Sequence, residues 1–443
     1  MKLLHIAIVT TVLLGGFAFG EDKQAVFRIE IQPVNFDRSP LPIACELPIS
    51  GGDQNWIRQS KLQGIKIEAL ELGGEKAPEP VICQITSAAW SNSEKDYGIR
   101  IMWNTQEDIP ANETRSYRVS IHKDNRSQEV LALERISSGI KCDVNQENIR
   151  LVKNGHTILQ YNVKPTAQAA ENEAYYSRSG YIHPLYSPSG AVITGDYAPD
   201  HKHQHGLFFA WTKTTYKGEP MEFWNQAKQL GNIRSLGDGP TIRSGVTFTQ
   251  FTVMQVFEKI AAKKNVPILH EIWRVKAYNL PSDYFLFDIT SSQNCVSDFP
   301  LTIEKYHYGG MAIRGNSQWL NPDKNAEPPA MMLTSEGKTR IDGNHSRPKW
   351  VVMSGLIDGK ESGVAVMSHP DNFRAPQWVR LHPTKPYFVF APMVEEAFKI
   401  EPGKSTYRSR FRYVTFDGEP DLKLLESIWK SYARPPEVKI SKM

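Results

Sequence analysis

The chain has 443 residues, with 52 Lys and Arg against 48 Asp and Glu, and a formal net charge of +4 at pH 7. This length suits two domains and allows a sizeable buried core without covalent staples. So weak a positive charge does not imply binding to nucleic acid or to a membrane surface, and we expect no nucleic-acid partner.

The first 20 residues have the pattern of a secretory signal peptide. Lys2 supplies a short positive region, residues 3–19 are mostly apolar, and Ala18 and Gly20 are small residues at the spacing for cleavage. No later stretch approaches the roughly 20 apolar residues that a membrane span needs. We therefore expect residues 1–20 to be removed and the protein to be secreted or periplasmic, with no membrane span.

Cysteine use gives little information about function. The four cysteines are Cys45, Cys83, Cys142 and Cys295. Their spacing matches no zinc-binding or redox motif, and export permits disulfides without requiring them. The sequence leaves open whether they are free thiols or include one bridge.

Short strand patterns follow one another in the first part of the chain. Residues 66–72, 81–90, 97–103 and 116–122 are rich in β-branched or aromatic residues. Turn clusters at 51–55 and 92–96 separate some of them. This spacing predicts a small β-sandwich over residues 21–140.

Longer and more aromatic strand patterns fill residues 141–418. The clearest are 245–260, 268–280, 283–296, 349–357, 362–369, 387–392 and 407–416. Long strands joined by short turns predict a large antiparallel β super-sandwich. The segment 419–433 is the convincing helix, because Leu422, Leu425, Ile428, Trp429 and Tyr432 share one face. The predicted fold class is therefore all-β, with a helix and tail at 419–443.

Polar chemistry gathers in the second part, where nine of the twelve histidines lie between His183 and His382. The stretch GDYAPDHKHQHGLFFAW, residues 195–211, places His201, His203 and His205 at alternate positions after Asp200. In an extended strand alternate side chains share one face, so these imidazoles would line one surface. Imidazoles can bind a metal, form hydrogen bonds or transfer protons near neutral pH. The alternative is a solvated, histidine-rich loop.

A metal site in this stretch lacks an expected ligand. Two histidines at i and i+2 can share one metal, but a cupin-like site also needs a carboxylate a few residues later. Residues 206–211 are Gly-Leu-Phe-Phe-Ala-Trp and contain no carboxylate. We therefore expect no cofactor, and a transition metal is possible but not favoured.

Two further stretches carry candidate acids, bases and cations. In 301–315, Glu304 and His307 are three positions apart and face opposite sides of a regular strand, and Arg314 ends the stretch. The stretch 368–383 is interrupted by prolines and reads as a binding loop. Its polar and aromatic residues are His369, Asp371, Asn372, Arg374, Trp378, Arg380 and His382. Glu304 could equally form a surface ion pair, and the loop could equally be a cap with its own polar contacts.

Trp224, in the stretch 218–231, is a candidate for stacking on a sugar ring. Its neighbours include Glu222 and Asn225, and aromatic rings beside polar groups suit the mixed surface of a sugar. A plain core position for Trp224 is an equally good interpretation.

The stretches 179–211, 304–315 and 368–383, together with YFVFAP at 387–392, resemble an exported bacterial family of unknown function labelled "methane oxygenase PmoA-like". The resemblance covers roughly residues 150–418. A particulate methane oxygenase subunit is an integral membrane protein, which this chain is not expected to be. The pattern is also similar to galactose-mutarotase-like super-sandwiches, in which histidines, an arginine and a carboxylate hold a sugar on a concave face. That similarity places His183, His203, His205, Arg314 and His369 in one site.

We therefore expect an exported carbohydrate-active enzyme, a hydrolase, lyase or epimerase, that acts on oligosaccharides by His–carboxylate acid–base chemistry. The expected catalytic residues are His203, His205, Glu304 and Arg314. The expected substrate-binding residues are His183, Asp200, His201, Trp224, His307, His369, Asn372 and Arg374. Two alternatives remain: non-catalytic glycan binding, and the metal-dependent oxidoreductase that the family label suggests.

Overall fold

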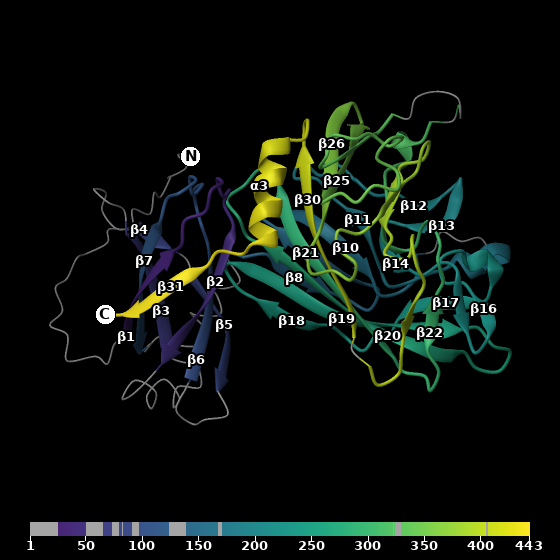
Figure 1. Cartoon of the computed structure of the whole chain (residues 1–443), viewed down its shortest axis with the longest axis horizontal. Helices are drawn as coiled ribbons and strands as arrows, with labels where there is room; N and C mark the ends of the chain where they lie inside the picture. Colours follow the sequence, from purple (N-terminus) through teal and green to yellow (C-terminus); the bar gives the residue numbers. More distant parts are fainter. Residues whose placement is uncertain are drawn as a thin grey trace, which may run out of the picture.

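The computed structural model describes residues 25–49, 65–72, 79–81, 83–90, 97–123, 139–166, 171–321, 323, 329–404 and 406–443. The predicted signal peptide and the predicted turns at 51–55 and 92–96 lie outside these residues. A small β-rich part and a larger one lie side by side (Figure 1). No helix among the described residues is long and apolar enough to cross a membrane.

The small part is a sandwich of two antiparallel sheets. One sheet has the strand order β31-β1-β7-β3-β4 and the other β2-β6-β5. Their bounds are β1 Ala25–Ile31, β2 Pro42–Ile49, β3 Ile65–Leu72, β4 Glu79–Val81, β5 Cys83–Trp90, β6 Tyr97–Asn104 and β7 Arg115–Lys123. Alternate apolar residues of β1, β2 and β6 form its core, as the period-two pattern predicts.

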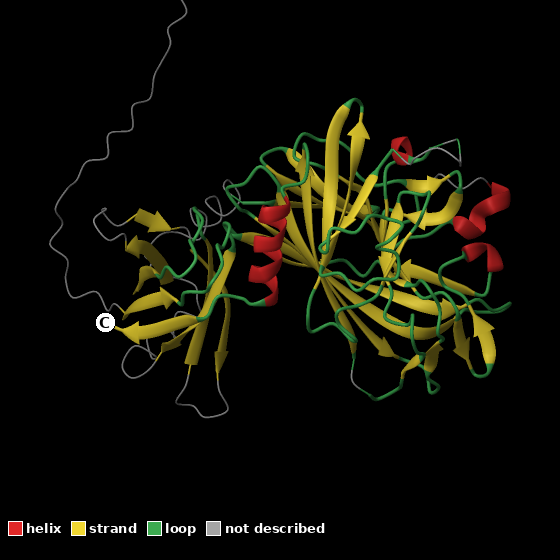
Figure 2. Cartoon of the chain, turned by 45° about the horizontal axis from the view of Figure 1, so that its top comes forward, coloured by secondary structure: helices red, strands yellow, loops and turns green. Residues whose placement is uncertain are grey.

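The C-terminal segment was expected as a helix and a tail, but it also contains a strand. Helix α3 spans Leu422–Ala433, and the side chain of Asp421 caps its first turn by accepting hydrogen bonds from two backbone N–H groups. Beyond it, β31 (Val438–Lys442) pairs with β1 in the small sandwich, with Ile29 opposite Ile440. In Figure 1 this yellow strand lies among the purple ones, and in Figure 2 the red helix α3 lies between the two parts.

The large part contains two extended antiparallel sheets. The first follows the order β17-β19-β20-β21-β30-β26-β25-β24, with β18 paired to β19. Its strands are β17 Gly231–Ser235, β18 Thr241–Ser244, β19 Phe248–Lys259, β20 Val266–Tyr278, β21 Phe285–Cys295, β24 Met331–Thr334, β25 Trp350–Ile357, β26 Lys360–Ser368 and β30 Tyr407–Asp417. The predicted all-β class with antiparallel sheets and a C-terminal helix is thus confirmed.

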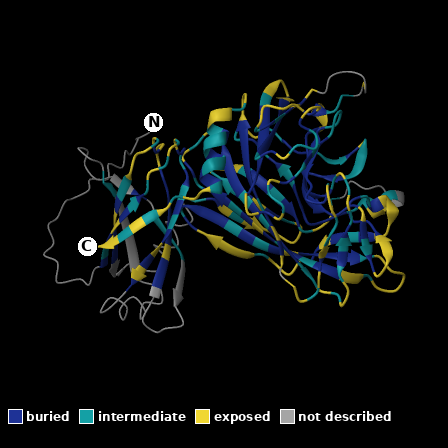
Figure 3. Cartoon of the chain, in the orientation of Figure 1, coloured by how far each residue is buried: buried dark blue, intermediate teal, exposed yellow. Residues whose placement is uncertain are grey.

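The second large sheet has the order β27-β28-β23-β14-β11-β10-β9-β8. Its strands are β8 Lys141–Val144, β9 Asn148–Lys153, β10 His156–Asn162, β11 Tyr181–Leu185, β14 Leu207–Ala210, β23 Gly310–Arg314, β27 Val379–Leu381 and β28 Tyr387–Phe390. Figure 3 shows that strands of the large part are mostly buried. Short sheets flank it, formed by β12 Asp196–Ala198 with β13 His201–His205, and by β15 Thr214–Tyr216, β16 Glu219–Met221, β22 Leu301–Ile303 and β29 Phe398–Ile400.

The two faces of the second large sheet have different partners. Phe390 packs against Phe411 of β30 at a ring-centroid distance of 5.5 Å, so this face meets the first sheet in the core. Because side chains alternate along a strand, Phe208, Ala312 and Val389, which lie opposite one another on neighbouring strands, point the other way. That outer face carries the polar residues described below.

All four cysteines are free thiols. Burial raises the pKa of the Cys45 thiol to about 12, so this thiol stays protonated at neutral pH. The structure therefore contains no disulfide bridge between any two of the four cysteines.

Candidate functional site

Strand β13 holds the three alternating histidines directly before β14, an internal strand of the second large sheet. It pairs with β12 as a short hairpin, with Asp196 opposite His205. Gly206 then turns the chain into β14 with a φ of +46°, a backbone conformation that side chains disfavour. A Cβ at this position would lie 2.0 Å from the carbonyl oxygen of Ile182, so only glycine fits where β13 meets β11.

A buried ion pair between Asp200 and Arg314 anchors the start of β13. The Arg314 guanidinium is fully buried and donates hydrogen bonds of 2.6 and 3.1 Å to the two Asp200 oxygens. It also donates to Gln204 Oε1 at 3.0 Å. Burial would raise the pKa of Asp200, but hydrogen bonds from His201 and Arg314 outweigh it and hold that pKa well below its usual range. Asp200 is therefore an anion, and Arg314 is occupied in holding it.

His201 lies next to this anion and faces other rings. Its Nδ1 is 2.8 Å from Asp200 Oδ2, and its side chain is 27% exposed. Its ring centroid is 5.4 Å from that of His203, 6.1 Å from His382 and 5.9 Å from Tyr387. We call Asp200, His201, His203, His382 and Tyr387 the Asp200 group.

The two histidines beside His201 are neutral. Burial, followed by the charges of His201 and His205, lowers the pKa of His203 to about 3. Burial and the charge of Arg380 lower the pKa of His382 to about 3 as well. Since the Nδ1 of His382 accepts hydrogen bonds from the backbone N–H groups of residues 384 and 385, its proton lies on Nε2. The group thus combines one anion with neutral imidazoles that can donate or accept hydrogen bonds.

His205 lies deeper than its two neighbours and has a different partner. Its Nδ1 is 2.7 Å from Asp196 Oδ1, and the hydroxyl of Tyr181 donates to the other Asp196 oxygen at 2.9 Å. His183 is close by and hydrogen-bonds Thr194 at 2.9 Å. Burial lowers the pKa of His183. These buried bonds hold β11, β12 and β13 together beneath the Asp200 group.

A second group of rings surrounds His307. Its ring centroid is 4.3 Å from Tyr306, 4.7 Å from Tyr308 and 6.3 Å from His345. Tyr308 packs edge-on against Trp224 at 5.1 Å, and Trp224 itself is buried against Phe208. We call Tyr306, His307, Tyr308 and His345 the His307 group. His307 is exposed and the other three are partly buried.

Arg380 of β27 connects the two groups electrostatically. Burial is the main cause that lowers the pKa values of His307, His345 and His382, and the positive charge of Arg380 is the second. The backbone N–H of His345 donates to the carbonyl oxygen of Val379 in β27 at 2.8 Å, and His382 directly follows this strand, so each group has a member next to β27. We call the Asp200 group and the His307 group together the histidine face.

Not all predicted residues join the histidine face. His369 packs against Tyr432 of α3 at 4.7 Å, beyond the other large sheet. Asn372 bonds Ser368 and the backbone of residue 410, and Arg374 donates to three loop carbonyls, so both organise the loop after β26. Glu304 accepts a hydrogen bond of 2.6 Å from Thr215, and no contact recorded between described residues links it to the Asp200 group.

The structure also adds residues to which the sequence assigned no role, two of them, Arg380 and His382, from the candidate loop 368–383. His382, Tyr387, Arg380 and His345 reach the histidine face from segments far along the chain. One signal was present: Arg380 and His382 alternate with the apolar Val379 and Leu381, which indicates a strand with one polar face. Nothing local in the sequence indicated that the ring of His382 would lie 6.1 Å from that of His201.

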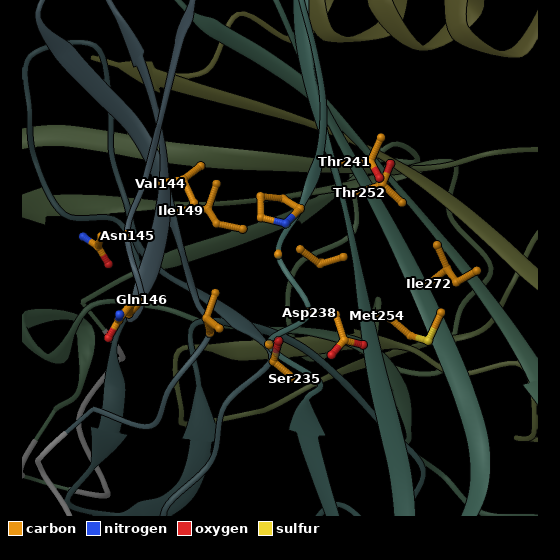
Figure 4. A pocket seen from close by; sticks show the side chains of 15 residues that line it. Val144, Asn145, Gln146, Ile149, Ser235, Asp238, Thr241, Thr252, Met254 and Ile272 are labelled. Atoms are coloured by element: carbon orange, nitrogen blue, oxygen red, sulfur yellow. The ribbon is translucent and has the colours of Figure 1, made fainter.

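A cavity of about 230 Å³ lies elsewhere in the large part (Figure 4). It is bounded by the turn between β8 and β9, with Asn145 and Gln146, and by the loop around Asp238. No predicted site residue lines it. Among the described residues, no group of three or more His, Cys, Asp or Glu side chains is placed to hold a metal ion.

Comparisons with known proteins give a family but no activity. No curated protein matches the chain. Two solved structures from Enterococcus faecalis are similar at low identity: a protein in the glycosyl hydrolase family 38 (8% identity, TM-score 0.43, 95% of this chain and 47% of that one) and an alpha-mannosidase (10% identity, TM-score 0.41, 96% and 46%). This chain therefore spans about half the length of each. A family model matches residues 148–430, so the chain belongs to the DUF6807 family, a family of unknown function.

Proposed function

We propose that the chain is an exported carbohydrate-active enzyme that uses acid–base chemistry at the Asp200 group. The observation that carries this proposal is the pairing of His201 with Asp200 at 2.8 Å, where Arg314 holds the carboxylate from the other side. A base oriented by a fixed anion is the arrangement that positions a proton-transfer residue.

The roles of the individual groups follow from their contacts. Since Asp200 is 2.8 Å from Nδ1 of His201, the opposite nitrogen Nε2 is left to take a proton from a sugar hydroxyl or to return one. His203 and His382 are neutral and half-buried, and they can bind further hydroxyl groups. Arg314 acts as a positioning residue, because both of its terminal nitrogens already bind Asp200.

The surroundings of His201 favour a sugar as the substrate. Tyr387, Tyr306 and Tyr308 contribute ring faces and hydroxyl groups to the histidine face. Aromatic rings with a few placed polar groups are typical of sites for small polar ligands. Hydrolysis, elimination and epimerisation all need this set of groups.

A test compares His201→Asn with the wild-type chain on a panel of plant and algal oligosaccharides, with product detection by mass spectrometry. General acid–base catalysis contributes about 10²–10⁴-fold, so we expect His201→Asn to lose at least about 100-fold in turnover. His156→Asn is the control, because His156 is exposed on β10. Equal turnover by wild type and His201→Asn would contradict the proposed role.

Glycan binding without turnover is the second candidate. The contacts of Asp200 favour it. Both Asp200 oxygens already accept hydrogen bonds from Arg314, and Oδ2 also lies beside His201, so the carboxylate is engaged within the protein. In that case the panel would show saturable binding, no product from any oligosaccharide, and weaker binding in His201→Asn and His203→Asn variants.

A further inference from the structure

Arg380 carries a guanidinium that has no hydrogen-bond or ion-pair partner among the described residues. It is the central residue of β27, whose neighbours Val379 and Leu381 point into the core. Arg380 therefore points to the opposite face, beside Val389 of β28. Its Nε is enclosed and has no hydrogen-bond partner, and no hydrogen bond or ion pair to Arg380 is recorded within the described part of the chain.

Three other arginines of the large part bind partners through their guanidinium groups, although the Nε of Arg314 is enclosed without a partner, as is the Nε of Arg380. Arg314 binds Asp200, Arg412 binds Asp288 at 2.7 and 2.9 Å, and Arg374 binds loop carbonyls. Buried polar groups are normally hydrogen-bonded, and an enclosed donor without a partner costs free energy. An arginine that is half-buried and unpaired on a polar face is therefore a candidate for binding a ligand.

The groups around Arg380 do not supply a negative charge. His307, His345 and His382 are imidazoles whose pKa values are lowered by burial and by Arg380, so they are neutral at neutral pH. Burial raises the pKa of Tyr387 to about 12, which keeps its hydroxyl protonated.

The two acids that act on this face are already paired. Asp200 is held by Arg314, with the Lys385 ammonium 3.8 Å away, and Glu222 lies 2.9 Å from the ammonium of Lys228. The histidine face therefore offers a net positive site at Arg380.

We propose that Arg380 binds an anionic substituent of the glycan, a carboxylate or a sulfate ester, so that the substrate class is an acidic oligosaccharide. This inference rests on the proposed function, since it assigns the substrate of the same face. The planar guanidinium matches a carboxylate or a sulfate with two parallel hydrogen bonds. The enclosed surroundings strengthen such a charge-assisted bond, and neutral imidazoles of His307 and His382 can complete the coordination of the anion.

The experiment measures binding by calorimetry with three matched sets of oligosaccharides: uronic acid oligomers, the same oligomers after reduction of the carboxyl groups, and sulfated neutral oligomers. We expect at least one anionic set to bind the wild-type chain about tenfold or more tightly than the neutral set. Arg380→Gln should reduce binding of that anionic set to the neutral level. Arg274→Gln is the matched control, since Arg274 is exposed on β20 and should leave binding unchanged.

Arg380→Lys keeps the charge but not the planar fork, and it should retain part of the preference for the anion. Circular dichroism of each variant checks that loss of binding does not come from misfolding. The preferred set distinguishes a carboxylate from a sulfate.

Two results would overturn the inference, and they differ in meaning. Equal affinity of the wild-type chain for anionic and neutral sets refutes the role of Arg380 and leaves the proposed function standing. An absence of binding and of turnover with all three sets refutes the proposed function, and the inference with it.

Discussion

Replacing Arg314 with Met removes the buried partner of Asp200. The Arg314 side chain is 0% exposed and that of Asp200 is 13% exposed, so water does little to solvate the carboxylate that remains. Two unit charges about 4 Å apart at an effective dielectric constant of about 20 attract each other by about 4 kcal/mol. Removing one partner of such a pair typically costs about 3–5 kcal/mol of unfolding free energy. We expect a loss in this range for Arg314→Met.

Urea denaturation followed by tryptophan fluorescence measures this loss. Arg150→Met is the control, because Arg150 is 3.6 Å from Asp143 and both side chains are about half exposed. Surface pairs of this kind contribute about 0–1 kcal/mol. In the Arg314→Met background, Asp200→Asn should recover part of the loss, because it removes the unpaired charge. A loss for Arg314→Met as small as that for Arg150→Met would refute the buried ion pair.

Two further predictions concern pH and backbone conformation. The pKa values of His203 and His382 are about 3 in the folded state, against roughly 6.5 when unfolded, so the unfolded chain binds more protons between these values. The stability of the wild-type chain, measured as its urea midpoint, should therefore fall as pH drops from 7 to 4.5. The urea midpoint of His203→Gln should fall less over the same range, and parallel pH profiles of the two proteins would contradict this prediction. Gly206→Ala should lower the urea midpoint more than Gly155→Ala, because both glycines have positive φ but only Gly206 has a carbonyl oxygen 2.0 Å from the added Cβ. Equal shifts of the urea midpoint in the two variants would show that the contact between the added Cβ and the Ile182 carbonyl oxygen costs no stability.

Local patterns predicted the strands and the terminal helix well. The alternation in residues 97–103 and 407–416 corresponds to β6 and β30, and the apolar face of 419–433 corresponds to α3. The short strand β31 was not predicted, because the alternation of Val438 and Ile440 with polar residues extends over only five residues. Its stability comes from pairing with β1, which is more than 400 residues away along the chain.

The structure brings some of the predicted site residues together and places others elsewhere. The sequence indicated His201, His203 and Asp200, because three alternating histidines after an acid are unusual and local. It assigned catalysis to His205, whereas the structure buries His205 against Asp196 and leaves His201 beside Asp200. It also assigned Arg314 a catalytic role, and in the structure the Arg314 guanidinium binds Asp200.

The sequence alone determined which segments are extended and which face of each strand is apolar, because these properties depend on neighbours two residues apart. Only the tertiary structure decided that Arg314 meets Asp200 across 114 positions, that His382 reaches His201, and that Arg380 has no partner among the described residues. Side-chain pairing and burial depend on which strands lie side by side, and long-range strand pairing is not encoded in any short stretch of residues.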